Sequence, residues 1–273
     1  MGYLIQSLVK ESLDEKLTCI ETLLNSDVVS FYGPVHDPVV DNFHNAIRNI
    51  SDRKPRLSIL VTTGGGSAES VERLVNVSRY YYQEIDFIVH DVAFSAGTIF
   101  CMSGNQIYMN CMSCLGPIDP QVLRDKIWVP ALGYIDKLHE LIEIAKIRPL
   151  TDAELSLMGN VDMAFIRHCE EAAELAKDLV RSWLEKYAFK GKNIQNVSQL
   201  AGHIASELSS HKKWHSHGRS IGLSEIQKLA PDINIIDYTN LQLFTTIESY
   251  HKLVQDYINN DLNTSFIHSR SFF

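Results

Sequence analysis

The sequence has no long uninterrupted apolar run and no excess of basic residues. No window reaches the roughly 18 apolar residues that a membrane-spanning helix needs. The start, MGYLIQSLVKESLDEK, has no apolar block of signal-peptide length. We therefore expect a cytoplasmic protein without a membrane span. Lysine and arginine number 25 against 33 aspartate and glutamate, a net charge of −8, which argues against nucleic-acid binding through bulk charge.

Cysteine is scarce, and common cofactor motifs are absent. The 5 cysteines are odd in number and are expected to be reduced core thiols. Cys111 and Cys114 form a single CxxC without the second pair of a zinc site. The glycine-rich GGGSAES lacks the Lys-Ser/Thr of a P-loop and does not match G-x-G-x-x-G. We expect no metal, nucleotide or organic cofactor.

The first part of the chain alternates strand-like and helix-like segments. Buried-strand patterns cover 27–35, 56–63, 84–94 and 105–110, and helical patterns follow the first three, with Asp37 as the expected cap of the first helix and Pro38 at its start. Such alternation indicates parallel β-α-β crossovers and an α/β core.

Helical patterns dominate after about residue 120. Helices are expected over 130–146, 197–208 and 241–260, and over 151–187 with a Thr151/Glu154 capping signal and an interruption near Gly159 and Asn160. A loop with a short helix and a small strand at 233–238 complete the pattern. We expect an α/β core over 1–125 and a helical extension over 126–273 that packs on the core and on partner subunits.

Two predicted turns of the core carry the residues of greatest chemical interest. Gly64, Gly65 and Gly66 directly follow a strand, where missing Cβ atoms let backbone N–H groups approach a ligand oxygen. Ser95 follows the next strand, and a serine at a helix start is usually only a cap. If the strands are neighbours, a glycine-turn amide and the amide of Ala96 converge on one oxyanion beside the Ser95 hydroxyl. A nucleophile with an oxyanion hole indicates acyl transfer.

Three segments resemble a known superfamily. ILVTTGGGSAESVERLV, FIVHDVAFSAGT and NCMSCLGPIDPQV follow one another like the oxyanion turn, nucleophile turn and following strand of the Clp protease proteolytic subunit and signal peptide peptidase A. The likeness is greatest to cytosolic serine dehydrogenase proteinases of the Clp-crotonase superfamily. The segments WVPALGYIDK, WHSHGRSIG and FIHSRSFF are similar to a bacterial subgroup of them.

This resemblance implies a Clp/crotonase-type β-α-β superhelical core and a peptidase that acts through an acyl-enzyme on Ser95. It also implies an oxyanion hole formed by Gly65 or Gly66 with Ala96. The superfamily commonly forms trimers, hexamers or larger rings, so a homo-oligomer is expected.

The resemblance gives two patterns for the general base. Where the Clp subunit has its catalytic histidine, this chain reads GPIDP, so that type of triad is not expected. Signal peptide peptidases use a lysine from a later helix, and Lys137 stands at the matching distance from Ser95. Lys126 and Lys146 are alternatives. So are His215 and His217, which WHSHGR places on one side of an expected extended segment.

Three functions fit these residues. A serine peptidase with a Ser-Lys dyad is the leading prediction. A crotonase-like acyl-CoA hydratase or isomerase would use the same paired amides to polarise a thioester. The third is a non-catalytic oligomeric scaffold built on the later helices.

Overall fold

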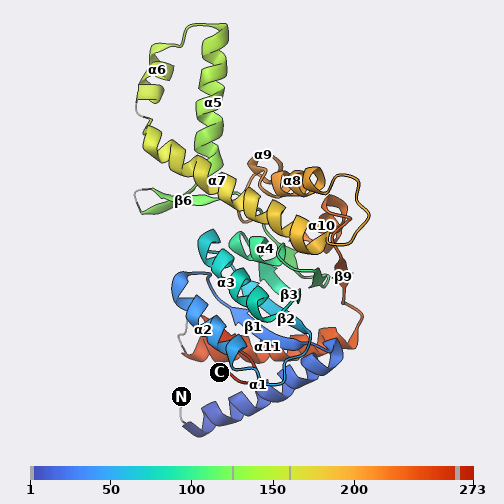
Figure 1. Cartoon of the computed structure of the whole chain (residues 1–273). Coiled ribbons are helices and arrows are strands. Elements are labelled where there is room, and N and C mark those ends of the chain that lie inside the picture. The colour runs from blue at the N-terminus through green and yellow to red at the C-terminus, as the bar shows by residue number, and fades with distance from the viewer. Residues whose placement is uncertain (1–2, 125, 160, 262–264) are drawn as a thin grey trace.

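The computed structural model describes residues 3–124, 126–159, 161–261 and 265–273 (Figure 1). Its main sheet has 8 strands in the order β10-β1-β2-β3-β4-β9, with β5 beside the end of β3 and β8 beside β5. Strands β1, β2, β3, β4 and β9 are parallel, as are β3 and β5, whereas β10 and β8 are antiparallel to their neighbours. The predicted α/β class with a mostly parallel sheet is confirmed.

The elements have the following bounds. The strands are β1 (Asp27–Tyr32), β2 (Arg56–Thr63), β3 (Glu84–Ala93), β4 (Gln106–Met109), β5 (Cys114–Leu115), β6 (Gln121–Arg124), β7 (Ile127–Pro130), β8 (Ile221–Gly222), β9 (Ile235–Asp237) and β10 (Phe266–His268). The helices are α1 (Tyr3–Leu24), α2 (Asp37–Arg48), α3 (Ala68–Tyr81), α4 (Ala96–Cys101), α5 (Ala131–Ile147), α6 (Asp152–Gly159), α7 (Met163–Trp183), α8 (Val197–Leu208), α9 (His211–Trp214), α10 (Leu223–Leu229) and α11 (Gln242–Asp261), with a π-helical turn over Leu184–Ala188.

Helices cover both faces of the sheet. Alternation along β1 points Val28 and Tyr32 into a cluster with α1 and α11, and Val29 and Phe31 into a larger cluster with α2, α3, α4, α7 and α8. Figure 1 shows α1 and α11 together under the sheet, with the other layer above it. Two-sided burial explains why the parallel strands are apolar runs and not alternating ones.

The ends of the chain complete this lower layer in a way that we did not predict. α1 packs along α11, and β10 pairs antiparallel with β1. Arg270, just after β10, forms ion pairs with the buried carboxylates of Glu21 at 3.1 Å and Asp27 at 2.9 Å. The two termini of the chain are thereby joined to the same edge of the sheet.

Two local predictions have opposite outcomes. The Thr151/Glu154 capping box is confirmed: Thr151 N–H donates to Glu154 Oε2 at 2.8 Å, and Glu154 N–H donates to Thr151 Oγ1 at 3.3 Å. Asp37 as a helix cap is wrong, because His36 occupies the cap position and Asp37 is the first helical residue. The Asp37 carboxylate instead accepts hydrogen bonds from Ser70 and Arg73 of α3.

Other details correct the expectations or add to them. The hairpin β6–β7 lies in a region where we expected few strands. α6 ends at Gly159, where an interruption was predicted, and Asn160 lies outside the described residues. Among the described residues no cysteine forms a disulfide, but Cys19 and Cys111 are exposed and not in the core. Among the described helices, none combines the length and the apolar character needed to span a bilayer.

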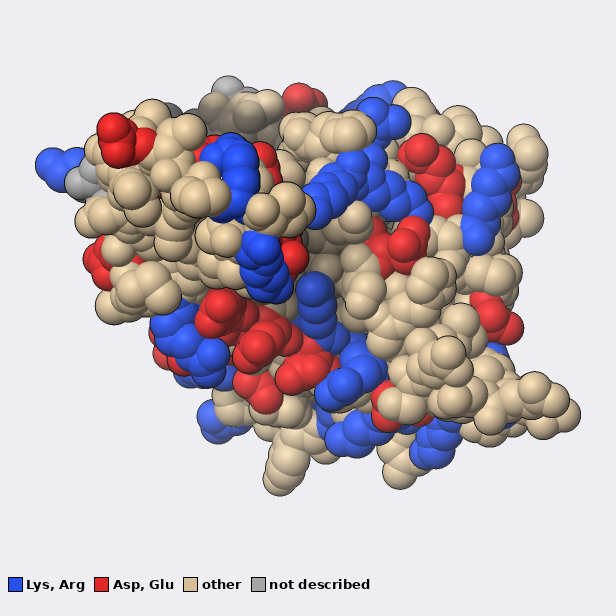
Figure 2. All heavy atoms as spheres, turned by 90° about the horizontal axis from the view of Figure 1, so that it is seen from above, with Lys and Arg blue, Asp and Glu red and all other residues tan. Residues whose placement is uncertain are grey.

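An arm of helices projects from this body. Figure 1 shows α5 and α6 standing away from the sheet, with α7 leading back to it. Seen from above, the surface carries lysine and arginine side chains interspersed with aspartate and glutamate (Figure 2).

Candidate active site

Ser95 lies in a strained turn between β3 and α4. Its backbone has φ 52° and ψ −116°, a combination that residues other than glycine rarely adopt. Its side chain makes no capping hydrogen bond to α4, although Ser95 occupies the cap position. Ser67 at the start of α3 shows the ordinary case, since its hydroxyl accepts from Ser70 N–H at 3.0 Å. The Ser95 turn has instead the sharp strand-to-helix form of a nucleophile turn.

The glycine turn after β2 lies directly beside Ser95. At Gly65, where φ is +113°, an added Cβ would lie 2.9 Å from Ser95 Cβ and 3.4 Å from Ser95 Oγ. At Gly66, where φ is +148°, an added Cβ would lie 1.9 Å from the carbonyl oxygen of Val35. Because β2 and β3 are neighbouring parallel strands, both turns leave the same edge of the sheet. The structure therefore brings the two predicted turns together.

The backbone N–H groups at these turns differ in availability. Gly65 N–H donates to Thr63 Oγ1 at 3.0 Å. Within the described residues, the N–H groups of Gly66 and Ala96 have no hydrogen-bond acceptor. These two donors are therefore not used in hydrogen bonds among the described residues.

A cavity of about 660 Å³ opens beside the glycine turn. Tyr32, Val92 and Ile258 give it apolar surface, and the side-chain amides of Gln255 and Asn259 on α11 also line it. Tyr32 Oη is hydrogen-bonded to His251 Nδ1 at 3.0 Å, and burial holds the pKa of Tyr32 well above its usual range. The cavity is therefore uncharged on this side and large enough for an amino-acid side chain.

The predicted lysines lie on the exposed surface. Lys137 on α5 has a side chain that is 58% exposed and pairs with Glu140 at 3.0 Å. It lines a separate, mostly apolar cavity of about 530 Å³ between α5 and α7, whose lining contains neither Ser95 nor the glycine turn. Lys146 pairs with Glu143, and Lys126 is exposed at the turn of the β6–β7 hairpin.

The two histidines of WHSHGR do not share one side of an extended segment. His215 ends α9 in a left-handed conformation with φ 61°. Its N–H donates to His211 O at 2.8 Å and so caps the last turn of the helix. It is exposed. His217 instead lies against Asp119, with Nδ1 3.0 Å from Oδ1.

Thr98 is a residue of this region that the sequence reasoning did not single out. Its hydroxyl lies 2.7 Å from Ala93 O and 2.8 Å from Gly116 O, and it accepts from Gly116 N–H at 2.9 Å. This holds the segment after β5 to the first turn of α4. The sequence shows Thr98 only as the threonine of SAGT. That it bonds to Gly116 becomes visible only in the folded structure.

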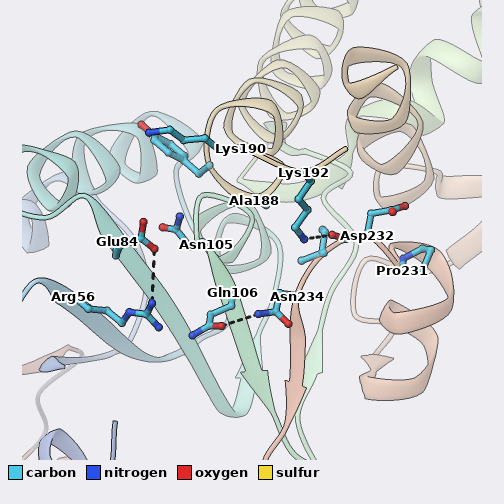
Figure 3. A pocket seen from close by; sticks show the side chains of 12 residues that line it. Arg56, Glu84, Asn105, Gln106, Ala188, Lys190, Lys192, Pro231, Asp232 and Asn234 are labelled. Atoms are coloured by element: carbon cyan, nitrogen blue, oxygen red, sulfur yellow. Dashed lines mark hydrogen bonds and ion pairs between the residues drawn. The ribbon is translucent and has the colours of Figure 1, made fainter. Parts of the chain in front are cut away.

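A third cavity, of about 560 Å³, lies at the opposite edge of the sheet. Figure 3 shows its side chains bonded to one another: Arg56 to Glu84, Lys192 to the carbonyl oxygen of Asp232, and Asn234 to Gln106. Arg56 and Glu84 begin β2 and β3, so this cavity faces the amino ends of the strands. Open α/β sheets bind ligands at the carboxyl ends, where Ser95 lies.

Comparisons with known proteins add a likeness of fold. No protein-family model and no curated protein matches the sequence. The solved structure of a serine-to-alanine mutant of the membrane-bound stomatin-specific protease 1510-N matches with a TM-score of 0.50 and 14% identity, over 80% of this chain and 82% of that chain. A lysine-to-alanine mutant of that protease with a substrate peptide matches with a TM-score of 0.47 and 14% identity, over 80% and 78%. The chain therefore shares the fold of the first of these structures, a stomatin-specific protease.

Proposed function

We propose that this chain is a serine peptidase that cleaves peptide bonds through an acyl-enzyme on Ser95. The observation that carries the proposal is the strained, uncapped Ser95 beside a glycine turn with a free N–H group. A serine held in an unfavourable backbone conformation without any capping bond has no evident structural role. The structural neighbour is a protease, which agrees with this chemistry.

The reaction follows from the geometry of the two turns. Ser95 Oγ attacks the peptide carbonyl carbon and loses its proton to a base, and the carbonyl electrons move onto the oxygen. The N–H groups of Gly66 and Ala96 stabilise that oxyanion. Gly65, whose N–H is held by Thr63, keeps the turn close to Ser95. The C–N bond then breaks, the amine leaves with a proton, and water hydrolyses the Ser95 ester.

The sequence-based prediction for the base is Lys137. In the single chain Lys137 is exposed and pairs with Glu140, so this assignment requires another subunit or the substrate to cover Lys137 and to break that ion pair. The Ser-Lys dyad stays a prediction, and the experiment below includes its variant.

The proposal extends to the architecture. We propose that residues 1–125 form a Clp/crotonase-type superhelical core, that residues 126–273 are its helical extension, whose strands β9 and β10 join the core sheet, and that the working form is a cytoplasmic homo-oligomer. The sequence resemblance and the projecting arm support this (Figure 1).

The deciding experiment is labelling with a fluorophosphonate probe, read by intact mass. Wild type is expected to gain one adduct, and Ser95→Ala none. Ser67→Ala is the matched control: it loses a helix cap, about 1 kcal/mol of stability, and keeps the adduct. Lys137→Ala tests the predicted base in the same series.

An unlabelled but folded wild type would contradict the peptidase proposal. Thermal stabilisation of the protein by an acyl-CoA would then favour the crotonase-like alternative. If an acyl-CoA did not stabilise it, the scaffold alternative would be favoured.

A further inference from the structure

A buried carboxylate, Asp119, follows the segment that packs against the nucleophile turn and has no role in the proposed chemistry. Asp119 is 1% exposed and follows β5. His217 Nδ1 lies 3.0 Å from its Oδ1, and His211 Nδ1 lies 3.7 Å from its Oδ2. Among the described residues, Oδ2 has no hydrogen-bond partner. A buried carboxylate that faces two histidines needs an explanation beyond packing.

Strand pairing attaches the Asp119 segment to the Ser95 turn. β5 continues alongside the end of β3, where Ala93 pairs with Leu115, and Ser95 follows two residues later. An added Cβ at Gly116 would lie 2.7 Å from the Phe94 ring. The Thr98 bonds to Gly116 hold the same segment from the other side. Gly116, three residues before Asp119, therefore packs against the nucleophile turn.

A second ladder brings His217 to this segment. β8 pairs antiparallel with β5, with Leu115 opposite Ile221. Beyond this two-residue ladder His217 lies in a turn, in which Arg219 N–H donates to Ser216 O. From that turn the His217 side chain reaches Asp119 through its hydrogen bond, although the two residues are 98 positions apart along the chain.

The carboxylate determines which nitrogen of His217 carries its proton. Because an ionised carboxylate only accepts, His217 Nδ1–H donates to Asp119 Oδ1. Nε2 is then left as the proton acceptor, the arrangement of a histidine base with its orienting carboxylate. The side chain of His217 is 24% exposed, so its ring is not sealed in the core.

We propose that His217, and not Lys137, is the general base of Ser95, and that Asp119 is its positioning residue. This rests on the proposed peptidase function. In the acylation step the Ser95 hydroxyl proton moves to His217 Nε2 as Oγ bonds to the carbonyl carbon. The C–N bond breaks and the amine leaves with that proton. In deacylation His217 takes a proton from water, and Ser95 Oγ regains it when the ester bond breaks.

The test measures the rate of fluorophosphonate labelling of Ser95 in the full chain. His217→Gly is expected to slow labelling about a hundred- to ten-thousand-fold, and added imidazole to restore part of the rate. Asp119→Asn is expected to slow it without rescue by imidazole, because the ring remains in place but is wrongly held. The matched loop variant His215→Asn is expected to label at the wild-type rate. Lys137→Ala separates the two candidate bases: loss of labelling in Lys137→Ala with unchanged labelling in His217→Gln would overturn the proposal.

Further readings separate catalysis from folding. Melting temperatures are measured with and without imidazole, and rescue of the rate at an unchanged melting temperature supports the base assignment. His217→Gln, which keeps a polar side chain, is expected to remain folded and slow. If wild type labels and His217→Gln labels equally fast, the base proposal is overturned while the peptidase proposal stands. If folded wild type does not label at all, both are overturned.

Discussion

At the scale of single residues, the conformation of Ser95 has a cost that can be measured. Glycine adopts φ 52° and ψ −116° without the Cβ penalty, whereas alanine retains it. We expect Ser95→Gly to be more stable than Ser95→Ala by about 1 kcal/mol, within the range for a strained backbone. Urea unfolding of the two inactive variants gives the difference. Equal stabilities would show that the turn is not strained.

The glycine turn offers a matched pair of substitutions. Gly66→Ala would place a Cβ 1.9 Å from Val35 O at φ +148°, so we expect a loss of about 1–3 kcal/mol or more. Gly64→Ala meets nothing within 4 Å and is expected to change stability by less than about 0.5 kcal/mol. Thermal unfolding of the two variants compares them. A Gly66→Ala protein as stable as Gly64→Ala would contradict the close approach to Val35.

At the scale of elements, the contact of α11 with the sheet predicts sensitivity to acid. His90 on β3 is 3% exposed, and its Nδ1 lies 2.9 Å from Tyr238 Oη. Burial lowers the pKa of His90 to about 4. Its unfolded pKa is about 6.5, so below that value the unfolded chain binds a proton that the folded chain excludes.

The stability that His90 contributes is therefore complete above about pH 6.5 and is lost as the pH falls towards about 4, at up to about 1.4 kcal/mol per pH unit. His90→Gln is expected to flatten this slope. Part of the slope of stability against pH is expected to remain in this variant, because burial also lowers the pKa values of His251 and His268. Urea midpoints across this pH range provide the measurement, and parallel curves for both proteins would contradict the assignment.

At the scale of the whole molecule, the projecting arm carries exposed apolar side chains. Leu157 on α6 is 59% exposed and Met163 on α7 is 64% exposed. Exposed apolar side chains grouped on one projecting element are typical of subunit interfaces. The oligomer that the sequence resemblance predicts would bury them.

Light scattering after size exclusion tests this prediction. Wild type is expected to be larger than 30.9 kDa, and Leu157→Asp with Met163→Asp is expected to reduce the mass. Tyr80→Asp, at a residue that is 83% exposed on α3, serves as the surface control and is expected to leave the mass unchanged. A monomeric wild type would count against the oligomer.

The sequence by itself determined the elements whose signals are local. Examples are the buried apolar run of β2, the glycine turn that ends it and the Thr151/Glu154 capping box. Each depends on residues a few positions apart, so each was predictable. The adjacency of the glycine turn and Ser95 also followed, because consecutive parallel strands usually pair. Lys137 as the base remains a sequence-based prediction that needs its own test.

Only the tertiary structure decided what depends on residues distant along the chain. No local pattern tells that α1 and β10 meet at β1, or that Asp37 bonds to α3 and does not cap its own helix. Asp119 and His217, which form a side-chain hydrogen bond, are 98 residues apart along the chain, and the β5–β8 ladder near them also joins distant residues. Such contacts form because whole elements bury apolar surface together, and their register then determines which polar side chains meet.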